Sequence, residues 1–373
     1  MSNILPSSTV PVLTADQLRK IGTRTFEAAG VPREEARIVA ESLVESNLTG
    51  HDSHGVIRIP QYLRMIASGR IKPDAQPKVV KETASTAIVD GQWGFGQVNA
   101  RWATELAIRK ARAHSVSAVA LINNNHVGRL GEYALMAAGK GMIGMVLGTG
   151  GSKKGQTAPY GGKVRRLSTA PISVAAPAGR SEPFLMDFAT SMVAEGKIMV
   201  MRDGGERIPE GWVIDRDGRP TTNPADYFDG GALLPFGGHK GYSLAVFVEI
   251  MAGILTGTGY GTSEKSKEGN SILVVAFDVA SFRPLDEFRR EMDDFFAHIR
   301  STPPAEGHDR VMLPGEPELE TKARRLKGGI DLPAKTWERI VQAAEGLGIC
   351  LRTCPDKLAA PGPAARDCWC HRG

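Results

Sequence analysis

Residues 116–147 decide the fold class, and they read VSAVALINNNHVGRLGEYALMAAGKGMIGMVL. The apolar, β-branched run Val116–Ile122 predicts a buried strand, and three asparagines and His126 follow its carboxyl end. Leu130–Gly139 predicts a helix, and Met142–Leu147 predicts the next strand. Strand and helix patterns that alternate in this way indicate an α/β domain.

The glycines at the end of this stretch are not a dinucleotide fingerprint. Gly139–Gly144 matches G-x-G-x-x-G by letter, but the fingerprint requires a strand before the glycines and a helix after them. Here the order is reversed, and a helix C-cap explains the glycines. The later glycine-rich run 148–155 follows a strand and is open enough to approach a phosphate.

Helices are expected in front of this domain. The capping box Thr14–Gln17 opens a helix that runs to about Ala29. A second helix is expected at 32–48 and a third at 56–68. Further strands are expected at 79–80, 86–89, 172–176, 184–187 and 271–277, and further helices at 97–112, 241–255, 285–300 and 334–347.

Composition excludes several classes of protein. The chain has 373 residues, 42% hydrophobic and 23% charged, with a net charge of +5, which is ordinary for a globular protein. It has no basic cluster with interleaved aromatics, so nucleic acid is not an expected partner. No apolar run is long enough for a membrane span, and residues 1–13 lack the features of a signal peptide. The expected location is the cytoplasm.

All four cysteines lie near the end of the chain, at Cys350, Cys354, Cys368 and Cys370. The main fold is therefore expected to use neither disulfides nor a cysteine nucleophile. The cysteine spacings do not fit the common zinc patterns, so no metal site is predicted there. Residues 355–373 are rich in Pro, Ala and Gly and are expected to be a disordered tail.

Residues 47–58, NLTGHDSHGVIR, gather the side chains best suited to catalysis. Histidine exchanges protons near neutral pH, and arginine presents a fork that matches a carboxylate. His54 with Arg58 four residues later suggests an enzyme that anchors a carboxylate and moves a proton beside it. Two alternatives stay open: histidines that only tie two helices together, and a metal-dependent hydrolase with His51, Asp52 and His54 as ligands.

Four segments together resemble the malate/L-lactate dehydrogenase family of NAD(P)-dependent oxidoreductases, over roughly residues 12–350. This family also holds ureidoglycolate and L-sulfolactate dehydrogenases and reductases of piperideine- and pyrroline-2-carboxylate. The segments are GHDSHGVIR (50–58), NNNHVGRLG (123–131), MDFATS (186–191) and PFGGHKGY (235–242).

The resemblance implies the architecture. A mixed β-sheet domain of non-Rossmann type would bind NAD or NADP, and a helical domain would be built from N- and C-terminal segments. The expected boundaries are 1–78 for the helical part with the His54 loop, 79–260 for the cofactor domain, and 261–354 for a part that packs back on the helical domain. A homodimer acting on a small carboxylate substrate is also implied.

The resemblance also implies roles for residues. His54 would be the proton donor and acceptor, Arg58 would grip the substrate carboxylate, and Asp187 would lie at the cofactor site and stabilise the charged imidazole. Asp187 could instead only cap the turn before Ala189. Ser53 and His126 are expected with Arg58 at the substrate. The expected cofactor contacts are Asn125, His126, Thr169, Asp187, His239, Lys240, Gly315 and Glu316.

The implied reaction is hydride transfer between NAD(P) and a small 2-hydroxy or 2-oxo acid such as malate or lactate. The alternatives are NADPH-dependent reduction of a cyclic 2-imino acid and a catalytically inactive relative that only binds. One departure concerns the substrate: the family's Thr-Asn-Pro reads Thr169-Ala170-Pro171 here. The contacts of that asparagine amide are lost or are made by another group.

Overall fold

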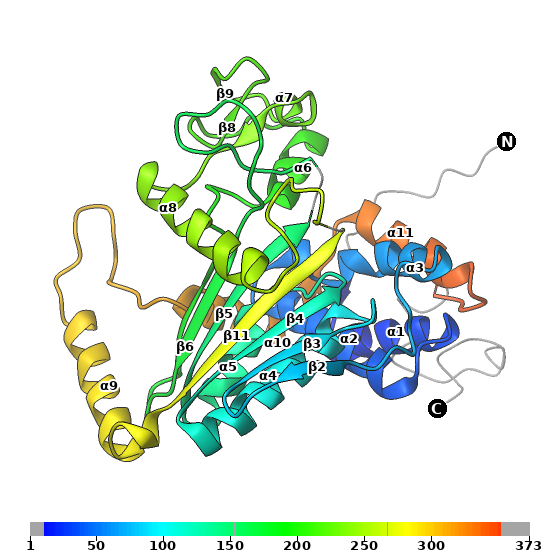
Figure 1. Cartoon of the computed structure of the whole chain (residues 1–373). Helices are drawn as coiled ribbons and strands as arrows, with labels where there is room; N and C mark the ends of the chain where they lie inside the picture. Colours follow the sequence, from blue (N-terminus) through cyan, green and yellow to red (C-terminus); the bar gives the residue numbers. More distant parts are fainter. Residues whose placement is uncertain (1–10, 152–153, 267, 352–373) are drawn as a thin grey trace, which may run out of the picture. The chain divides into compact units, whose positions relative to one another are not determined.

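A mixed β-sheet of seven strands is the centre of the larger unit of the chain (Figure 1). The computed structural model describes residues 11–151, 154–266 and 268–351. These residues divide into two units: the sheet unit, Ala75–Pro317, and the helical unit, which comprises the segments up to Asp74 and from Glu318. The expected α/β class with a mixed sheet and a helical part from both ends of the chain is confirmed.

The sheet combines one parallel pair with antiparallel neighbours. Strands β3 and β4 run parallel, and every other adjacent pair runs antiparallel. In spatial order the strands are β2 (Lys78–Glu82), β3 (Thr86–Asp90), β4 (Val116–Asn124), β11 (Gly269–Asp278), β5 (Met142–Gly151), β6 (Ile172–Ala176) and β7 (Phe184–Phe188).

Strand β11 corrects an expected domain boundary. Residues 261–354 were expected to pack back on the helical domain, but β11 lies between β4 and β5 in the middle of the sheet. Its residues Ile272–Val274 are buried. They form an apolar run, as expected for a central strand that is covered on both faces. Residues 261–317 therefore belong to the sheet unit.

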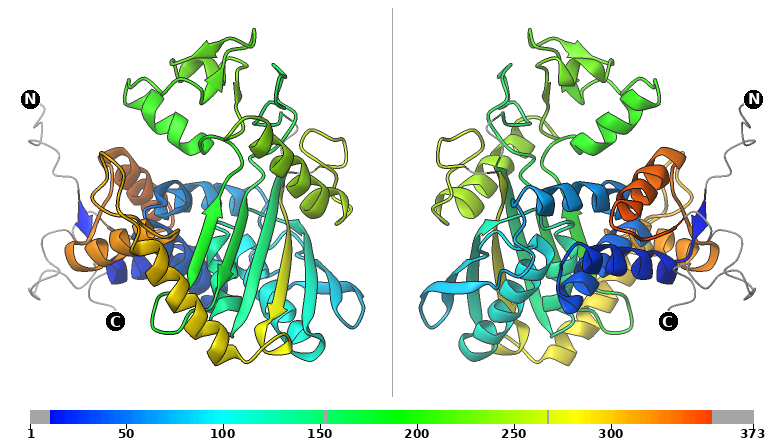
Figure 2. Two further views of the ribbon diagram at one scale, coloured as in Figure 1. Left: turned by 90° about the vertical axis from the view of Figure 1, so that its left-hand side faces the viewer. Right: turned by 90° about the vertical axis from the view of Figure 1, so that its right-hand side faces the viewer.

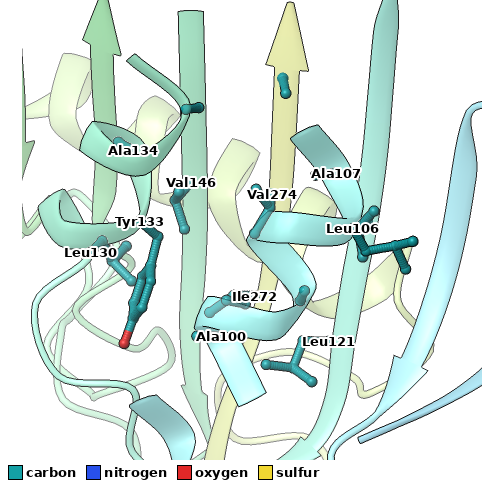
Figure 3. Packing of buried hydrophobic residues seen from close by; sticks show 14 of the residues in the cluster. Ala100, Leu106, Ala107, Leu121, Leu130, Tyr133, Ala134, Val146, Ile272 and Val274 are labelled. Atoms are coloured by element: carbon teal, nitrogen blue, oxygen red, sulfur yellow. The ribbon is translucent and has the colours of Figure 1, made fainter. Parts of the chain in front are cut away.

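Helices cover both faces of the sheet. On one face lie α4 (Gly96–His114) and α5 (Gly131–Ala138), and on the other lie α8 (His239–Val248) and the π-helix Glu249–Ile254. Figure 3 shows the first face, where alanines of α4 let the helix approach the strands closely. The labelled residues there are Ala100, Leu106, Ala107, Leu121, Leu130, Tyr133, Ala134, Val146, Ile272 and Val274.

A small three-stranded sheet lies beyond one end of the large sheet (Figure 2). Its strands are β8 (Val213–Ile214), β9 (Pro220–Thr221) and β10 (Ala232–Leu233), with helices α6 (Glu195–Asp203) and α7 (Ala225–Phe228) beside them. Strands of two residues carry no readable alternation, so the sequence analysis missed them. The sheet unit also contains η4 (Val279–Ser281) and α9 (Leu285–Arg300).

The helical unit joins the two ends of the chain. The capping box of Thr14 and Gln17 opens α1 (Ala15–Ala28) as predicted. Strand β1 (Val12–Leu13) pairs antiparallel with β12 (Ile330–Asp331). Between them in sequence lie α2 (Arg33–Leu48), the 3-10 turns η1 (Asp52–His54) and η2 (Val56–Arg58), α3 (Ile59–Ala67) and α10 (Glu316–Gly328), and α11 (Ala334–Glu345) follows.

Gly139 and Gly141 lie between α5 and β5, and Gly144 lies within β5, so the order is helix, glycines, strand and the rejection of a Rossmann fingerprint is confirmed. The single helix expected at 241–255 is α8 continued by the π-helix. The expected disordered tail, with Cys354, Cys368 and Cys370, lies outside the described residues. Within the described ranges, no helix is both long and apolar enough to cross a membrane.

Candidate active site

Asn47 shapes the loop that carries His54. It lies in the last turn of α2 and is buried. Its Oδ1 accepts a hydrogen bond from the Val56 amide at 2.8 Å, and its Nδ2 donates to Asp52 Oδ1 at 2.6 Å. The Asn47 side chain thus connects the end of α2 to both 3-10 turns of the loop.

Asp52 is held a second time by Arg325 of α10. The guanidinium donates to both carboxylate oxygens, at 2.7 and 2.9 Å. This hydrogen-bonded pairing raises the pKa of Arg325.

The contacts of this loop bear on the metal-site alternative. An Asp52 carboxylate engaged by Arg325 and Asn47 is a poor metal ligand. The imidazole of His51 lies 3.6 Å from the Glu318 carboxylate. Across the described part of the chain, no group of three His, Cys, Asp or Glu is arranged to hold a metal ion.

Ser53, His54 and Arg58 lie together on this loop. The Ser53 hydroxyl is 3.0 Å from His54 Nδ1, which orients the imidazole ring. Arg58 Nε donates to the Ser53 carbonyl at 2.7 Å, and its Nη1 donates to Gln61 Oε1 at 2.7 Å. All three residues are only half-buried. The loop therefore presents a group that exchanges protons beside a fixed guanidinium.

Gly55 leaves the room that Asn47 needs. A Cβ at position 55 would lie 2.2 Å from Asn47 Oδ1. Gly55→Ala is expected to push the amide away and leave the Val56 N–H unpaired, at a cost of about 1–3 kcal/mol in the free energy of unfolding. Urea unfolding measures this. The control is Gly328→Ala, the same change where a Cβ meets nothing within 4 Å. Equal effects of the two substitutions would contradict the role of Asn47.

Asp187 lies on β7 and contacts the start of α5. Its Oδ2 accepts a hydrogen bond from the Gly131 amide at 2.8 Å and lies 3.8 Å from Arg129 Nη1. The side chains of Arg129 and Asp187 are 5% and 11% exposed. A carboxylate at a helix N-terminus is stabilised by the helix dipole. Asp187 therefore caps the N-terminus of α5.

Asn125 and His126 follow β4 in a tightly packed segment. Asn125 is buried and donates to the carbonyls of Trp93 and Gly94, at 2.8 and 2.9 Å. A Cβ on Gly96 would lie 2.1 Å from the His126 carbonyl oxygen. The segment thus lies against the start of α4, and the half-buried His126 side chain is set by a rigid backbone.

Thr169 and Ala170 form a loop held against Thr190. The Thr169 carbonyl accepts hydrogen bonds from the Thr190 amide and hydroxyl, both at 3.0 Å. Ala170 is fully buried and has a φ of +40°. Asparagine tolerates positive φ better than alanine does, so the family's asparagine would suit this backbone. Ala170 has no side-chain amide to make the contacts of that asparagine.

His239 and Lys240 open α8 after two glycines with positive φ, 55° at Gly237 and 64° at Gly238. Both side chains are exposed, and the His239 ring meets the edge of the Tyr160 ring at a centroid distance of 6.0 Å. Amides in a first helical turn face anions at the positive end of the helix dipole. This turn has the donors and the cation that a phosphate group needs.

Glu316 serves a local contact. Its carboxylate accepts from the Leu313 amide at 2.7 Å and from Arg300 Nε and Nη2 at 2.8 and 2.6 Å. Burial alone would raise the pKa of Glu316, but these donors outweigh burial and hold it below its ordinary value. Gly315 before it has a φ of +93°, and a Cβ there would lie 3.2 Å from Leu185 Cβ. Glu316 thus fixes the turn at Gly315.

A cavity of about 160 Å³ lies beside the carboxyl end of β4 in the sheet unit. Most of the residues that line it are polar or glycine. Most of these residues could not be predicted from the sequence, because single serines, threonines and glycines carry no motif. They are Trp93, Ile122, Asn123, Asn124, Thr149, Gly257, Thr258, Gly259, Lys265, Ser266, Gly269, Asn270 and Ser271.

The structure thus groups the expected residues by unit. Ser53, His54 and Arg58 lie together in the helical unit. The other expected site residues belong to the sheet unit, where Asp187 contacts α5 and Thr169 contacts Thr190.

The family model described as malate/L-lactate dehydrogenase matches residues 13–341. The chain belongs to this family. Malate dehydrogenase of Pyrococcus horikoshii is 39% identical over 345 residues, which cover 90% of this chain and 95% of that protein. L-sulfolactate dehydrogenase of Methanocaldococcus jannaschii is 36% identical over 346 residues, covering 91% and 98%. A solved structure described as a putative malate/lactate dehydrogenase from E. coli has a TM-score of 0.85 and 34% identity, covering 92% of this chain and 97% of that one.

Proposed function

We propose that this member of the malate/L-lactate dehydrogenase family transfers a hydride reversibly between NAD or NADP and a small 2-hydroxy acid. The observation that carries the proposal is the arrangement of Ser53, His54 and Arg58 on one loop fixed by Asn47 and Arg325. The relatives named malate and L-sulfolactate dehydrogenase support a substrate that is a hydroxy acid with at least one anionic group.

The chemistry of the loop fits this reaction. Reduction of a 2-oxo acid builds negative charge on the carbonyl oxygen, and a protonated His54 can neutralise it by donating a proton. In the reverse direction the neutral imidazole accepts the hydroxyl proton. Arg58, already held by Ser53 and Gln61, can bind the substrate carboxylate with its remaining donors and orient the reacting carbon.

The sheet unit has groups that fit a nicotinamide dinucleotide. Lys240 and His239, in the first turn of α8, would hold the phosphates of the cofactor. Thr169 and Asp187 would lie near the rest of the cofactor. When bound, the cofactor accepts or supplies the hydride. His126 and Ser53 would line the substrate site. We propose contacts from Asn125, Gly315 and Glu316 through their backbone, since the side chains of Asn125 and Glu316 already hold local hydrogen bonds.

We further propose a homodimer in the cytoplasm. The outer side of α8 and the π-helix exposes apolar side chains, including Phe247, Ile250, Ile254 and Leu255. A contiguous apolar face of this kind suits a contact with a second protein surface. A second copy of the chain is the partner we propose, because most oligomers are symmetric assemblies of one chain.

A substrate panel tests the proposed activity. The purified chain is assayed by nicotinamide absorbance with malate, lactate, sulfolactate and ureidoglycolate, with their 2-oxo partners, and with cyclic 2-imino acids, using each cofactor. We expect turnover of at least one 2-hydroxy acid, unchanged by a chelator. Turnover of cyclic imino acids alone would establish the reductase alternative, and loss of activity with chelator would favour metal chemistry. No turnover with any of these would contradict the proposal.

A further inference from the structure

Glu249 is a buried carboxylate that the reaction as described does not use. It is 3% exposed and is the first residue of the π-helix that continues α8. Its oxygens accept three hydrogen bonds: from the Ser168 amide at 2.7 Å, the Thr149 hydroxyl at 2.9 Å and the Gly261 amide at 2.9 Å. A buried carboxylate persists only where such donors compensate its lost hydration.

One of the three donors adjoins the proposed cofactor contact Thr169, and the other two belong to segments at the cavity beside β4. Ser168 begins the loop that contains Thr169 and Ala170. Thr149 lies near the end of β5 and lines the cavity beside β4. Gly261 ends the turn whose residues 257–259 line the same cavity. One carboxylate therefore connects the Thr169 loop to two walls of the cavity.

A second layer of hydrogen bonds extends this connection to Ala170. The Thr149 hydroxyl also lies 3.2 Å from Ser168 Oγ, and Ser168 Oγ accepts from the Ala170 amide at 3.0 Å. Ala170 has a φ of +40°, which a non-glycine residue keeps only where its surroundings impose it. The network that begins at Glu249 reaches the backbone amide of this residue.

The three donors require a hydrogen-bond acceptor at both ends of the side-chain carboxylate of residue 249. Glu249 Oε1 faces the Ser168 N–H, and Oε2 faces the Gly261 N–H and the Thr149 hydroxyl. A glutamine at this position would turn an NH₂ group toward one of the two backbone N–H groups, and that amide would lose its acceptor. π-Helical turns inside α-helices often occur at functional sites.

We propose that Glu249 is a positioning residue that holds the Ser168–Ala170 loop and the 257–261 turn in the shape that binds the cofactor. It acts through Ser168, Thr149 and Gly261 and touches no reacting atom. The inference rests on the proposed function, because Thr169 is one of the proposed cofactor contacts.

The test compares Glu249→Gln with a matched control, Asp293→Asn. Asp293 of α9 is also mostly buried, and it accepts three backbone N–H groups, from Gly179, Arg180 and Ser181. Both changes convert a carboxylate that faces amides into an amide. Both are expected to lower the melting temperature, so stability alone does not separate them.

Cofactor binding separates them. Glu249→Gln is expected to raise the KM for the cofactor by roughly 10- to 100-fold, which is the loss that one unpaired buried amide would cause. The Kd of reduced cofactor, measured by fluorescence, is expected to rise by the same factor. We expect kcat to change far less than KM, as for a loss of uniform binding. Asp293→Asn is expected to leave both constants close to those of the wild type. If Glu249→Gln does not fold, Thr149→Val removes one donor to the same carboxylate and should give a smaller rise in KM and Kd.

The outcomes separate the two proposals. A wild-type chain that binds neither NADH nor NADPH would overturn the proposed function, and this inference with it. A wild type that binds, together with folded Glu249 or Thr149 variants that bind equally well, would overturn the role of Glu249 alone. An equal loss of cofactor affinity in Asp293→Asn would also overturn it, because the effect would then be one of general stability.

Discussion

His54→Ala is expected to lower kcat by about 10²- to 10⁴-fold while cofactor binding stays unchanged, because a positioned general acid–base group contributes that much. Ser53 contacts Nδ1 of the imidazole and orients the ring for the proposed proton transfer. Steady-state kinetics and fluorescence titration with reduced cofactor measure the two effects. His51→Ala is the control, since His51 lies 3.6 Å from Glu318 and has no proposed part in proton transfer.

Two results would contradict this role of His54. Near wild-type turnover in His54→Ala would remove His54 from the mechanism. An equally large loss of kcat in His51→Ala, with the melting temperature unchanged, would show that the loss is not specific to His54.

Arg58→Lys is expected to raise the KM for the carboxylate substrate by roughly 10- to 100-fold, since hydrogen bonds to charged groups contribute about 1.5–3 kcal/mol. Lysine keeps the charge but cannot donate to the Ser53 carbonyl and to Gln61 while also binding a carboxylate by two parallel bonds. Part of kcat should be lost as well, because a poorly held carboxylate misaligns the reacting carbon.

The control for Arg58 is Arg64→Lys on α3, an exposed arginine of the same helical unit. Initial rates over a range of substrate concentrations give both constants. An unchanged KM in Arg58→Lys for every carboxylate that the wild type accepts would show that another residue holds the acid. Arg129 is a weak candidate for that role, because it is buried beside Asp187.

Local signals predicted much of the fold. The Thr14–Gln17 capping box and the alternating strands and helices of 116–147 appear where the sequence placed them, because propensity, capping and periodicity agree there. The order of helix, glycines and strand at 139–144 was enough to reject a Rossmann site. The position of β11 was not readable, since strand order depends on pairings far apart in sequence.

The candidate site was only partly readable. His54 and Arg58 stand in a dense local motif, so the sequence indicated them and their neighbour Ser53. Asn47, Arg325 and Glu249 were missed, because each acts through contacts that join distant segments, such as Arg325 with Asp52. A single asparagine, arginine or glutamate within a helical pattern is indistinguishable from a solvated side chain.

Asp187 illustrates the limit of a motif. The sequence left two roles open for it, a place at the cofactor site and a helix cap. The structure supplies a cap at Gly131 of α5, a helix more than fifty residues away in sequence. A cap and a place at the cofactor site are compatible roles for one carboxylate.

The transfer of deuterium from substrate to cofactor tests the proposed hydride transfer. The purified chain is incubated with a hydroxy acid deuterated at carbon 2 and with NAD⁺ or NADP⁺, and the reduced cofactor is examined by mass spectrometry and proton NMR. The account predicts deuterium at C4 of the nicotinamide ring and the matching 2-oxo acid in equal amount. Oxidation of the acid with no deuterium in the cofactor, or no oxidation of any 2-hydroxy acid with either cofactor, would contradict it.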